Sequence, residues 1–390
     1  MKILMICKYP PIQGGVSAEA YWTANAFSEL GHSVFVLTNA NEVEEAYRTE
    51  LDTKDTALLR GFRIKDAIRL HSTELDKKHI YVPQNNPSIS KLVSVGIGTI
   101  EEFRPDFIYS FYVEPYGVVA MILSRLMNLP YTIRHAGSDI GRLMLTEQLH
   151  MLYHKVFCGA QAVLTSEKHH QMFKEIGVTE NRFVRPVSLR LPGDIFHAEG
   201  RNPRSSIVKI GMYGKVGKAK GTQQAIEAIK VLSSQGTKLS FQAHWGGRDM
   251  FEYSTLVKAS GMSLDIFQIS RFIPQWKIPD FIRSRDIILF LENNFKIAFH
   301  TPGIPYEVWA CGAHLVTTEE IAQKQHVKKF VNESNCTVIR DRITDKSVAK
   351  AIIRAIEKGG QEETDFDAAI QSIRSRQDTQ NMLTQIGSLL

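Results

Sequence analysis

The sequence alternates short apolar runs with longer stretches of helical period, and this alternation constrains the fold more than any other feature. Parallel strands require crossover connections, usually helices, so the pattern favours βα units and parallel sheets. The apolar runs predicted as strands in the first half are residues 2–7, 33–37, 106–110, 131–134, 162–165 and 182–187. Those in the second half are residues 207–212, 239–243, 264–269, 287–291, 314–317 and 337–339.

The first predicted helix spans residues 16–30. Its apolar residues recur every three or four positions and therefore share one face, and Gly31 is a typical left-handed stop. Helices are also predicted at residues 222–233 and 347–357. Residues 41–94, by contrast, are polar and have little clear hydrophobic periodicity. We expect them to form a long, irregular insertion on the surface.

The chain is long enough for two domains. Its 390 residues exceed what one hydrophobic core usually supports, and residues 189–206 concentrate Pro, Gly, Arg and Ser in the manner of a linker. We therefore expect an α/β protein with two facing Rossmann-like domains, each with a parallel sheet, and an inter-domain cleft in which ligands bind. The expected divisions are a first domain at 1–190, a linker at 191–206, a second domain at 207–372 and a C-terminal helix at 373–390 that returns to the first domain.

Composition and charge exclude several classes of protein. Hydrophobic residues make up 43% and charged residues 23% of the chain, which rules out a disordered protein. No apolar run approaches the roughly 20 residues of a membrane helix, and the apolar start ends at Lys8, too early for a secretory signal. The net charge of +6 is scattered and belongs to no nucleic-acid module, so we expect no nucleic-acid partner.

Four cysteines lie far apart in apolar surroundings and form no CxxC pair. We interpret them as buried reduced thiols of a cytosolic protein. They are Cys7, Cys158, Cys311 and Cys336.

A glycine-containing turn follows the first strand of each half. Gly14 and Gly15 precede the first helix, where free N–H groups can bind an anion, although a plain strand-to-helix turn fits equally well. Lys215 and Lys220 lie in a turn of three lysines and three glycines, which suits a diphosphate or, alternatively, a solvated surface turn. The dinucleotide fingerprint GxGxxG is absent and the P-loop pattern fails, which counts against a nicotinamide dehydrogenase.

Two further candidates are a histidine and a glutamate. His135 follows a predicted strand; a lone histidine is more often structural, yet this position suits contact with a substrate. Glu307 lies in the first turn of a short predicted helix that ends at Gly312. There it either complements the helix dipole, which is the more ordinary interpretation, or accepts hydrogen bonds from a ribose diol.

Taken in order, these motifs resemble those of the retaining glycosyltransferases of family 4, which have the GT-B fold. The order is a PxxGG loop, His-x-Gly-x-Asp, a Gly-basic-x4-Lys-Gly turn and Glu-x3-Cys-Gly, and it covers nearly the whole chain. The resemblance implies transfer of a sugar, with retention, from a UDP- or GDP-sugar to a saccharide or lipid-linked saccharide in polysaccharide or glycoconjugate biosynthesis. The first domain would lie on the acceptor side and the second would bind the nucleotide-sugar. The resemblance implies no cofactor and no metal ion.

The resemblance also implies roles for individual residues. His135 would contact the transferred sugar, and Lys215 and Lys220 would neutralise the leaving diphosphate, so these three are the implied catalytic residues. Glu307 would hold the ribose, and residues 271–273 would border the base. The full donor-binding set that the resemblance implies is Gly14, Gly15, Lys215, Lys220, Arg271, Ile273, His300, Thr301, Pro302, Gly303 and Glu307.

Two positions depart from the family pattern and leave other functions open. Phe299 stands where the family has the first glutamate of a Glu-x7-Glu pair, which holds sugar hydroxyls; His300 and Thr301, or Glu292 through a shifted loop, could substitute. Lys215 replaces an arginine and so lacks its bidentate fork. The alternatives are a GT-B-like sugar-nucleotide epimerase, a phosphorylase, or a catalytically degenerate nucleotide-sugar-binding protein. We expect a cytoplasmic location, with peripheral contact at the cytoplasmic membrane face.

Overall fold

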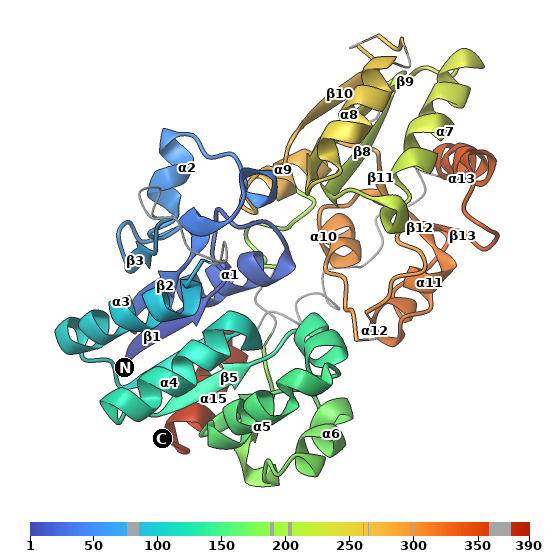
Figure 1. The fold of residues 1–390 in the computed structure, drawn as a ribbon. Coiled ribbons are helices and arrows are strands. Elements are labelled where there is room, and N and C mark those ends of the chain that lie inside the picture. The colour runs from blue at the N-terminus through green and yellow to red at the C-terminus, as the bar shows by residue number, and fades with distance from the viewer. Residues whose placement is uncertain are drawn as a thin grey trace.

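The computed structural model contains two parallel sheets, each covered by helices on both faces (Figure 1). It describes residues 1–75, 86–187, 191–201, 205–259, 261–263, 265–297, 299–358 and 376–390. The first sheet has the strand order β3-β2-β1-β4-β5-β6-β7, and the second has the order β10-β9-β8-β11-β12-β13, with every pairing parallel. The predicted α/β fold with two Rossmann-like domains is therefore confirmed.

Every apolar run predicted as a strand overlaps one in the structure, although Leu264 lies outside the described residues and the run at 182–187 pairs over only two of its residues. The strands of the first domain are β1 (Lys2–Cys7), β2 (Ser33–Thr38), β3 (Ile68–Ser72), β4 (Phe107–Phe111), β5 (Tyr131–Arg134), β6 (Ala162–Leu164) and β7 (Phe183–Val184). Those of the second are β8 (Val208–Lys215), β9 (Leu239–Gly246), β10 (Phe267–Arg271), β11 (Ile287–Phe290), β12 (His314–Thr318) and β13 (Cys336–Ile339).

The helices follow the strands as crossover connections, which is why strands adjacent in sequence can pair in parallel. In the first domain they are α1 (Gly15–Glu29), α2 (Thr53–Leu58), α3 (Ser88–Phe103), α4 (Val118–Met127), α5 (His150–Gly159) and α6 (His170–Glu175). In the second they are α7 (Thr222–Ser234), α8 (Met250–Ala259), α9 (Ile278–Arg283), α10 (Ile304–Ala310), α11 (Glu319–Ala322), α12 (Gln325–Lys328) and α13 (Asp345–Lys358).

The segment expected to be an irregular insertion contains regular structure, so that expectation is wrong in part. Strand β3 lies at the sheet edge, where only one of its faces is covered, and its few apolar residues gave too weak a signal. Helix α2 begins with a capping box in which Asp52 and Asp55 each accept a hydrogen bond from the other's backbone N–H. Residues 76–85 of the segment lie outside the described residues.

A buried ion pair fixes α1 against the centre of the first sheet. Arg134, at the end of β5, pairs with Glu19 of α1, and both side chains are buried. The guanidinium carbon of Arg134 lies 4.7 Å from the ring centroid of Phe111. Because the pair is shielded from water, it holds the start of α1, and hence the glycine turn before it, in a fixed position.

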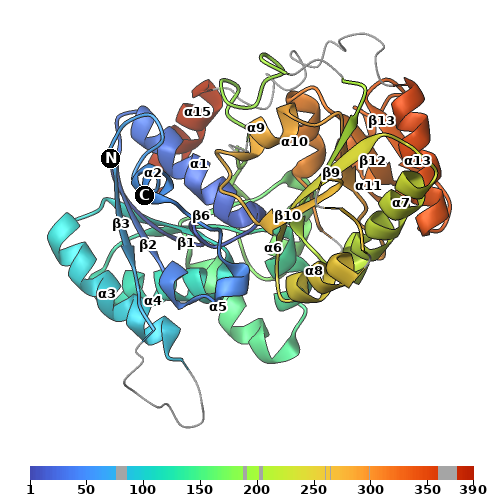
Figure 2. The ribbon, with the colours of Figure 1, turned by 90° about the horizontal axis from the view of Figure 1, so that it is seen from above.

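The two domains lie side by side (Figure 2), and they make polar contacts at α2 and at the segment before it. The backbone N–H of Gly247 donates to the carbonyl oxygen of Ala46 across 2.9 Å. The indole N–H of Trp276 donates to the buried carboxylate of Asp55 across 2.8 Å, and Lys277 pairs with the same carboxylate at 2.6 Å. The domains are therefore close together, with polar contacts that span the boundary.

The C-terminal helix α15 (Arg376–Gly387) contacts α1 and β7 of the first domain. Met382, Leu383 and Ile386 are buried there in the hydrophobic core. The predicted linker at 191–206 and the predicted end of the second domain at 372 fall partly outside the described residues.

The cysteines are reduced in the structure. Cys7, Cys311 and Cys336 are buried, whereas Cys158 is only half-buried and donates a hydrogen bond to the carbonyl oxygen of Ile176. Within the described ranges, no helix has the length and hydropathy needed to span a membrane.

Candidate active site

The boundary between the domains collects positively charged side chains from both. Lys8 follows β1, and Lys215 ends β8. Burial and the charges of Lys215 and Arg142 lower the pKa of Lys8 to about 8, against an opposing effect of Asp139. Partial desolvation and the charges of Lys220 and Arg142 lower the pKa of Lys215. Lys8, Arg142 and Lys215 are therefore near enough to repel one another across the boundary, and Lys220 acts on Lys215 from the same domain.

Lys8 and Lys215 lie against aromatic rings. The Nζ atom of Lys8 lies 4.5 Å from the ring centroid of Tyr112, and that of Lys215 lies 5.6 Å from the centroid of Tyr47. Among the described residues, no carboxylate lies within ion-pair distance of either lysine. No described carboxylate therefore neutralises either ammonium group, and each can pair with an anionic ligand.

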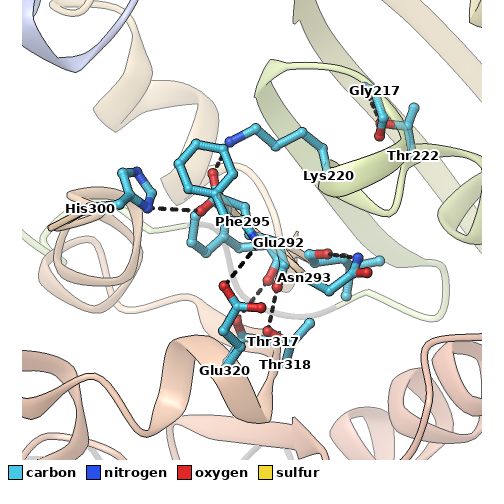
Figure 3. Close-up of polar contacts among 12 residues, drawn as sticks. Gly217, Lys220, Thr222, Glu292, Asn293, Phe295, His300, Thr317, Thr318 and Glu320 are labelled. Carbon is cyan, nitrogen blue, oxygen red and sulfur yellow. Dashed lines mark hydrogen bonds and ion pairs between the residues drawn. The ribbon is translucent and has the colours of Figure 1, made fainter. Parts of the chain in front are cut away.

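The turn that carries Lys215 and Lys220 depends on glycine. The N–H of Gly217 donates to the hydroxyl oxygen of Thr222 across 3.1 Å, which joins the turn to the start of α7 (Figure 3). Gly221 has a φ of 64°, and a Cβ there would lie 2.6 Å from the Cβ of Leu291. The absence of a side chain thus lets the turn pack against the loop after β11.

Lys220 reaches across this contact to a buried carboxylate (Figure 3). It forms an ion pair with Glu292, and its Nζ atom lies 4.2 Å from the ring centroid of Phe295. The Nδ1 atom of His300 lies 3.2 Å from the other oxygen of Glu292. Burial raises the pKa of Glu292, while the charge of Lys220 acts in the opposite direction. Glu292 therefore links the predicted diphosphate lysine to a predicted sugar-binding residue.

Glu307 is held by a tyrosine from the neighbouring strand. It lies in the first turn of α10, and its Oε2 atom accepts a hydrogen bond from the hydroxyl group of Tyr213 across 2.6 Å. Burial, together with the charge of Glu307, raises the pKa of Tyr213 well above its ordinary value. The phenol therefore stays protonated and remains a donor, so it orients the Glu307 carboxylate.

His135 lies at the end of β5 among hydrophobic and aromatic side chains. Its Nε2 atom lies 2.7 Å from the hydroxyl oxygen of Thr165, and its ring lies 5.3 Å from those of His169 and Phe173. Burial and the neighbouring His169 lower the pKa of His135 to about 3. At neutral pH His135 is therefore uncharged, which suits hydrogen bonding to a sugar rather than proton donation.

The aspartate of the His-x-Gly-x-Asp motif holds the loop after β5. The carboxylate of Asp139 accepts hydrogen bonds from the backbone N–H groups of Ala136 at 2.8 Å, Ile140 at 2.9 Å and Val113 at 3.2 Å. Burial raises the pKa of Asp139 to about 7, while these hydrogen bonds lower it. The structure thus gives Asp139 a positioning role in the segment that carries Arg142.

Phe299, at the position of the missing glutamate, contacts the first domain. Its ring makes an edge contact with His169, with centroids 4.9 Å apart. A Cβ on Gly137 would clash with the Phe299 carbonyl oxygen, and one on Gly141 would lie 3.2 Å from its ring. The two glycines therefore allow the loop after β11 to pack closely on the first domain.

The other predicted donor residues of the second domain are more dispersed. Arg271, at the end of β10, pairs at 2.7 Å with Glu45 of the first domain. Ile273 is half-buried against the hydrophobic core. The loop before α10 contains exposed Thr301, buried Pro302 and half-buried Gly303. The carbonyl oxygen of Gly303 accepts a hydrogen bond from the backbone N–H of Glu307 across 3.2 Å, so this loop lies directly against the first turn of α10.

The glycine turn of the first domain lies at the same boundary. Gly14 has a φ of 110°, which favours glycine, and Gly15 begins α1. The preceding side chain, Gln13, is buried and packs so closely against Gly246 of β9 that no Cβ would fit there. The structure thus brings this turn next to the second domain.

Sequence reasoning missed Lys8, Arg142 and Tyr213. Lys8 directly follows the first strand, so the rule that selected Lys215 could have found it. Arg142 lies in a single turn of π-helix, Asp139–Leu143, and Tyr213 lies within β8. Neither of those two positions has a sequence signal.

In the parts of the chain that the structure describes, no group of three or more His, Cys, Asp or Glu side chains could hold a metal ion.

Comparisons place this arrangement among known folds. No protein-family model and no curated protein matches the sequence significantly. A structure of Anabaena Alr3699/HepE in complex with UDP and glucose is similar along all of both chains, with 14% identity and a TM-score of 0.66. A glycosyltransferase from Rickettsia africae is similar over 99% of this chain and 95% of its own, with 14% identity and a TM-score of 0.60.

An enzyme of another class has the same architecture. The UDP-GlcNAc 2-epimerase from Neisseria meningitidis, bound to UDP-GlcNAc, is similar along all of both chains, with 10% identity and a TM-score of 0.61. At such identities the likeness establishes the fold alone. The protein thus has the GT-B fold, with two facing Rossmann-like domains, and this fold serves both sugar transfer and sugar epimerisation.

Proposed function

We propose that the protein is a glycosyltransferase that moves a sugar, with retention, from a nucleotide-diphosphate-sugar to a saccharide or lipid-linked saccharide. The observation that carries the proposal is the set of four cations at the domain boundary, contributed by Lys8, Arg142, Lys215 and Lys220. Glu292 pairs with Lys220, whereas no described carboxylate pairs with Lys8 or Lys215, and such a cluster of like charges is unfavourable unless an anion binds there. The diphosphate of a nucleotide-sugar has suitable charge and would explain why both domains contribute.

The same cations suit the chemical step. The acceptor hydroxyl oxygen forms a bond to the anomeric carbon while the bond from that carbon to the diphosphate oxygen breaks. The bonding electrons leave with the nucleoside diphosphate, which also takes the hydroxyl proton. Fixed cations stabilise the negative charge that develops on this leaving group, and they supply this stabilisation without a metal ion. Lys8 and Lys215, which have no described carboxylate partner, are suited to this task.

Other site residues suit the remainder of the donor. The Glu307 carboxylate, oriented by Tyr213, would accept hydrogen bonds from the ribose. His135 would contact the sugar in its neutral form, beside the loop of His300, Thr301 and Pro302. HepE in complex with UDP-glucose, a structure of the same fold, makes UDP-sugars the first donors to test, followed by GDP-sugars.

A transfer assay tests the proposal. UDP- and GDP-sugars are incubated with saccharide and prenyl-diphosphate-linked acceptors, with and without EDTA. We expect acceptor-dependent release of nucleoside diphosphate, a product that retains the donor's anomeric configuration by NMR, and no loss of activity in EDTA. Lys215→Gln should be impaired, whereas Lys230→Gln, an exposed lysine of α7, should match the unmodified protein. Nucleotide binding without transfer across the panel would instead indicate a degenerate binding protein.

An epimerase is the second candidate, because enzymes of that class share the fold and because two buried carboxyl groups lie near the cations. Burial raises the pKa of Asp139 to about 7, so this group could exchange protons near neutral pH, and burial also raises the pKa of Glu292. Incubation with UDP-GlcNAc alone distinguishes the two functions. An epimerised sugar nucleotide formed without any acceptor would favour the epimerase.

A further inference from the structure

A pocket of about 450 Å³ lies between the domains, beside the segment that contains Phe299. Its volume falls within the range of about 300–1,000 Å³ that is typical of small-molecule sites. Lys168 comes from the first domain and the other lining residues come from the second, so both domains form the pocket. The lining residues are Lys168, Phe299, His300, Thr301, Lys324, Gln325, His326 and Lys329.

The pocket is strongly basic. Three lysines line it, and its lining contains no carboxylate. Of the residues that the structure describes, none forms an ion pair with Lys168, Lys324 or Lys329. Lys324 is half-buried, and the Nζ atom of Lys329 lies 4.8 Å from the ring centroid of Phe330. Three unpaired ammonium groups around one concave surface favour an anionic ligand.

The pocket adjoins the candidate active site on both sides. The charge of Lys168 lowers the pKa of both His135 and His169, and the charge of Lys324 lowers that of Glu292. The three lysines are therefore distinct from the four cations at the proposed diphosphate site, yet electrostatically coupled to the residues next to it.

We propose that this pocket binds the acceptor, and that the acceptor carries a phosphate or diphosphate group that contacts Lys168, Lys324 and Lys329. This inference rests on the proposed function, and it specifies the chemical class of the acceptor. An acceptor in this pocket would meet the donor sugar at Phe299, His300 and Thr301, the segment that lines the pocket and precedes α10. Lysines bind phosphate as point charges and do not require a planar carboxylate-like group.

Titration calorimetry on UDP-saturated protein tests the proposal with two phosphate probes. Glucose 1-phosphate represents a free sugar phosphate, and farnesyl diphosphate in detergent represents a lipid-linked diphosphate; glucose and farnesol are the uncharged controls. The pocket variant is Lys168→Gln/Lys324→Gln/Lys329→Gln. The matched control is Lys65→Gln/Lys346→Gln/Lys350→Gln, which removes the same charge from exposed positions outside the pocket.

We expect at least one phosphate probe to bind, its uncharged control not to bind, and the pocket variant to lose about tenfold in affinity, since each lost charge-assisted contact weakens binding. The control variant should match the unmodified protein, and UDP affinity should be similar in all three. Binding of one probe alone identifies the source of the phosphate. The proposal is wrong if neither probe binds or if both variants lose affinity equally. Absence of UDP binding to the unmodified protein would instead overturn the proposed function.

Discussion

The hydroxyl group of Tyr213 donates a hydrogen bond to the Glu307 carboxylate across 2.6 Å, joining β8 to the first turn of α10. This contact gives Glu307 a fixed direction, which a carboxylate needs if it is to accept hydrogen bonds from a ribose. Sequence position alone had favoured a simple effect on the helix dipole. Tyr213 orients the Glu307 carboxylate, and this favours a role in ligand binding over a simple effect on the helix dipole.

Replacement of Tyr213 by phenylalanine should therefore weaken nucleotide binding without removing the carboxylate. Loss of one hydrogen bond to a charged group, worth about 1.5 kcal/mol, corresponds to a rise in the UDP dissociation constant of about tenfold. Pyrophosphate has no ribose, so its affinity should not change. Tyr253→Phe, at another buried tyrosine of the second domain, is the control. Equal UDP affinity in Tyr213→Phe and the unmodified protein would contradict the positioning role.

Lys220 and Glu292 should behave as a coupled pair. Lys220→Met leaves the buried Glu292 carboxylate without its cation, which should cost about 3 kcal/mol of unfolding free energy near pH 7.5. The variant also loses the charge that lowers the pKa of Glu292, so this pKa rises further. Protonation then relieves the penalty as the pH falls, and Lys220→Met should approach the unmodified protein in acid.

Urea unfolding at two pH values measures this coupling. Lys220→Met/Glu292→Gln should recover most of the stability at the higher pH, because the uncompensated charge is gone. If Lys220→Met loses the same stability in the Glu292→Gln background as alone, the two residues are independent and the interpretation fails.

His135 and His169 should make stability depend on pH. Their pKa values are lowered to about 3 and about 4, in each case chiefly by burial. Unfolded histidine titrates near 6.5, so below that pH the unfolded state binds protons first, and stability falls as the pH decreases towards about 4. Each histidine contributes up to about 1.4 kcal/mol per pH unit in this window.

The His135→Gln variant should show a shallower acid dependence of its urea midpoint than the unmodified protein. His71→Gln, an exposed position on the edge strand β3, should follow the unmodified protein. If His135→Gln and His71→Gln give the same profile, His135 is not buried in its neutral form as the structure has it.

Gly137 should control how closely the domains approach. Alanine there would press on the Phe299 backbone of the other domain, so Gly137→Ala should open the boundary. We expect a larger radius of gyration by small-angle scattering and weaker UDP binding, with Phe299→Ala changing both in the same direction. Gly98→Ala is the control, because a Cβ at Gly98 meets no atom within 4 Å. An unchanged radius of gyration in Gly137→Ala would show that this contact does not hold the domains together.

The sheets could be predicted because parallel strands covered on both faces are continuous apolar runs. Strand β1 illustrates this, since all but its first residue are buried. Strand β3 was missed for the converse reason: it lies at the sheet edge, and four of its five residues are partly or fully exposed to solvent. The hydrophobic pattern of a strand reflects how much of it is buried. An edge strand buries few side chains, so its pattern is too weak to identify it.

The candidate site was only partly predictable, because a local sequence pattern does not show which residues of the two domains lie close together. Lys215 and Lys220 were identified from one turn, but the opposing Lys8 and Arg142 depend on how the two domains meet. Phe299 was recognised only as a missing glutamate. Its contact with His169 requires two glycines in a loop more than 150 residues away along the chain, which no single segment reveals.

The most direct test of the account is UDP and GDP affinity in two lysine variants, Lys8→Gln in the first domain and Lys215→Gln in the second. If the diphosphate binds between both domains, each variant should lose about tenfold in affinity, and the loss should shrink as salt screens the charges. Lys230→Gln should retain full affinity. Full affinity in Lys8→Gln, or no binding of either nucleotide to the unmodified protein, would contradict the account.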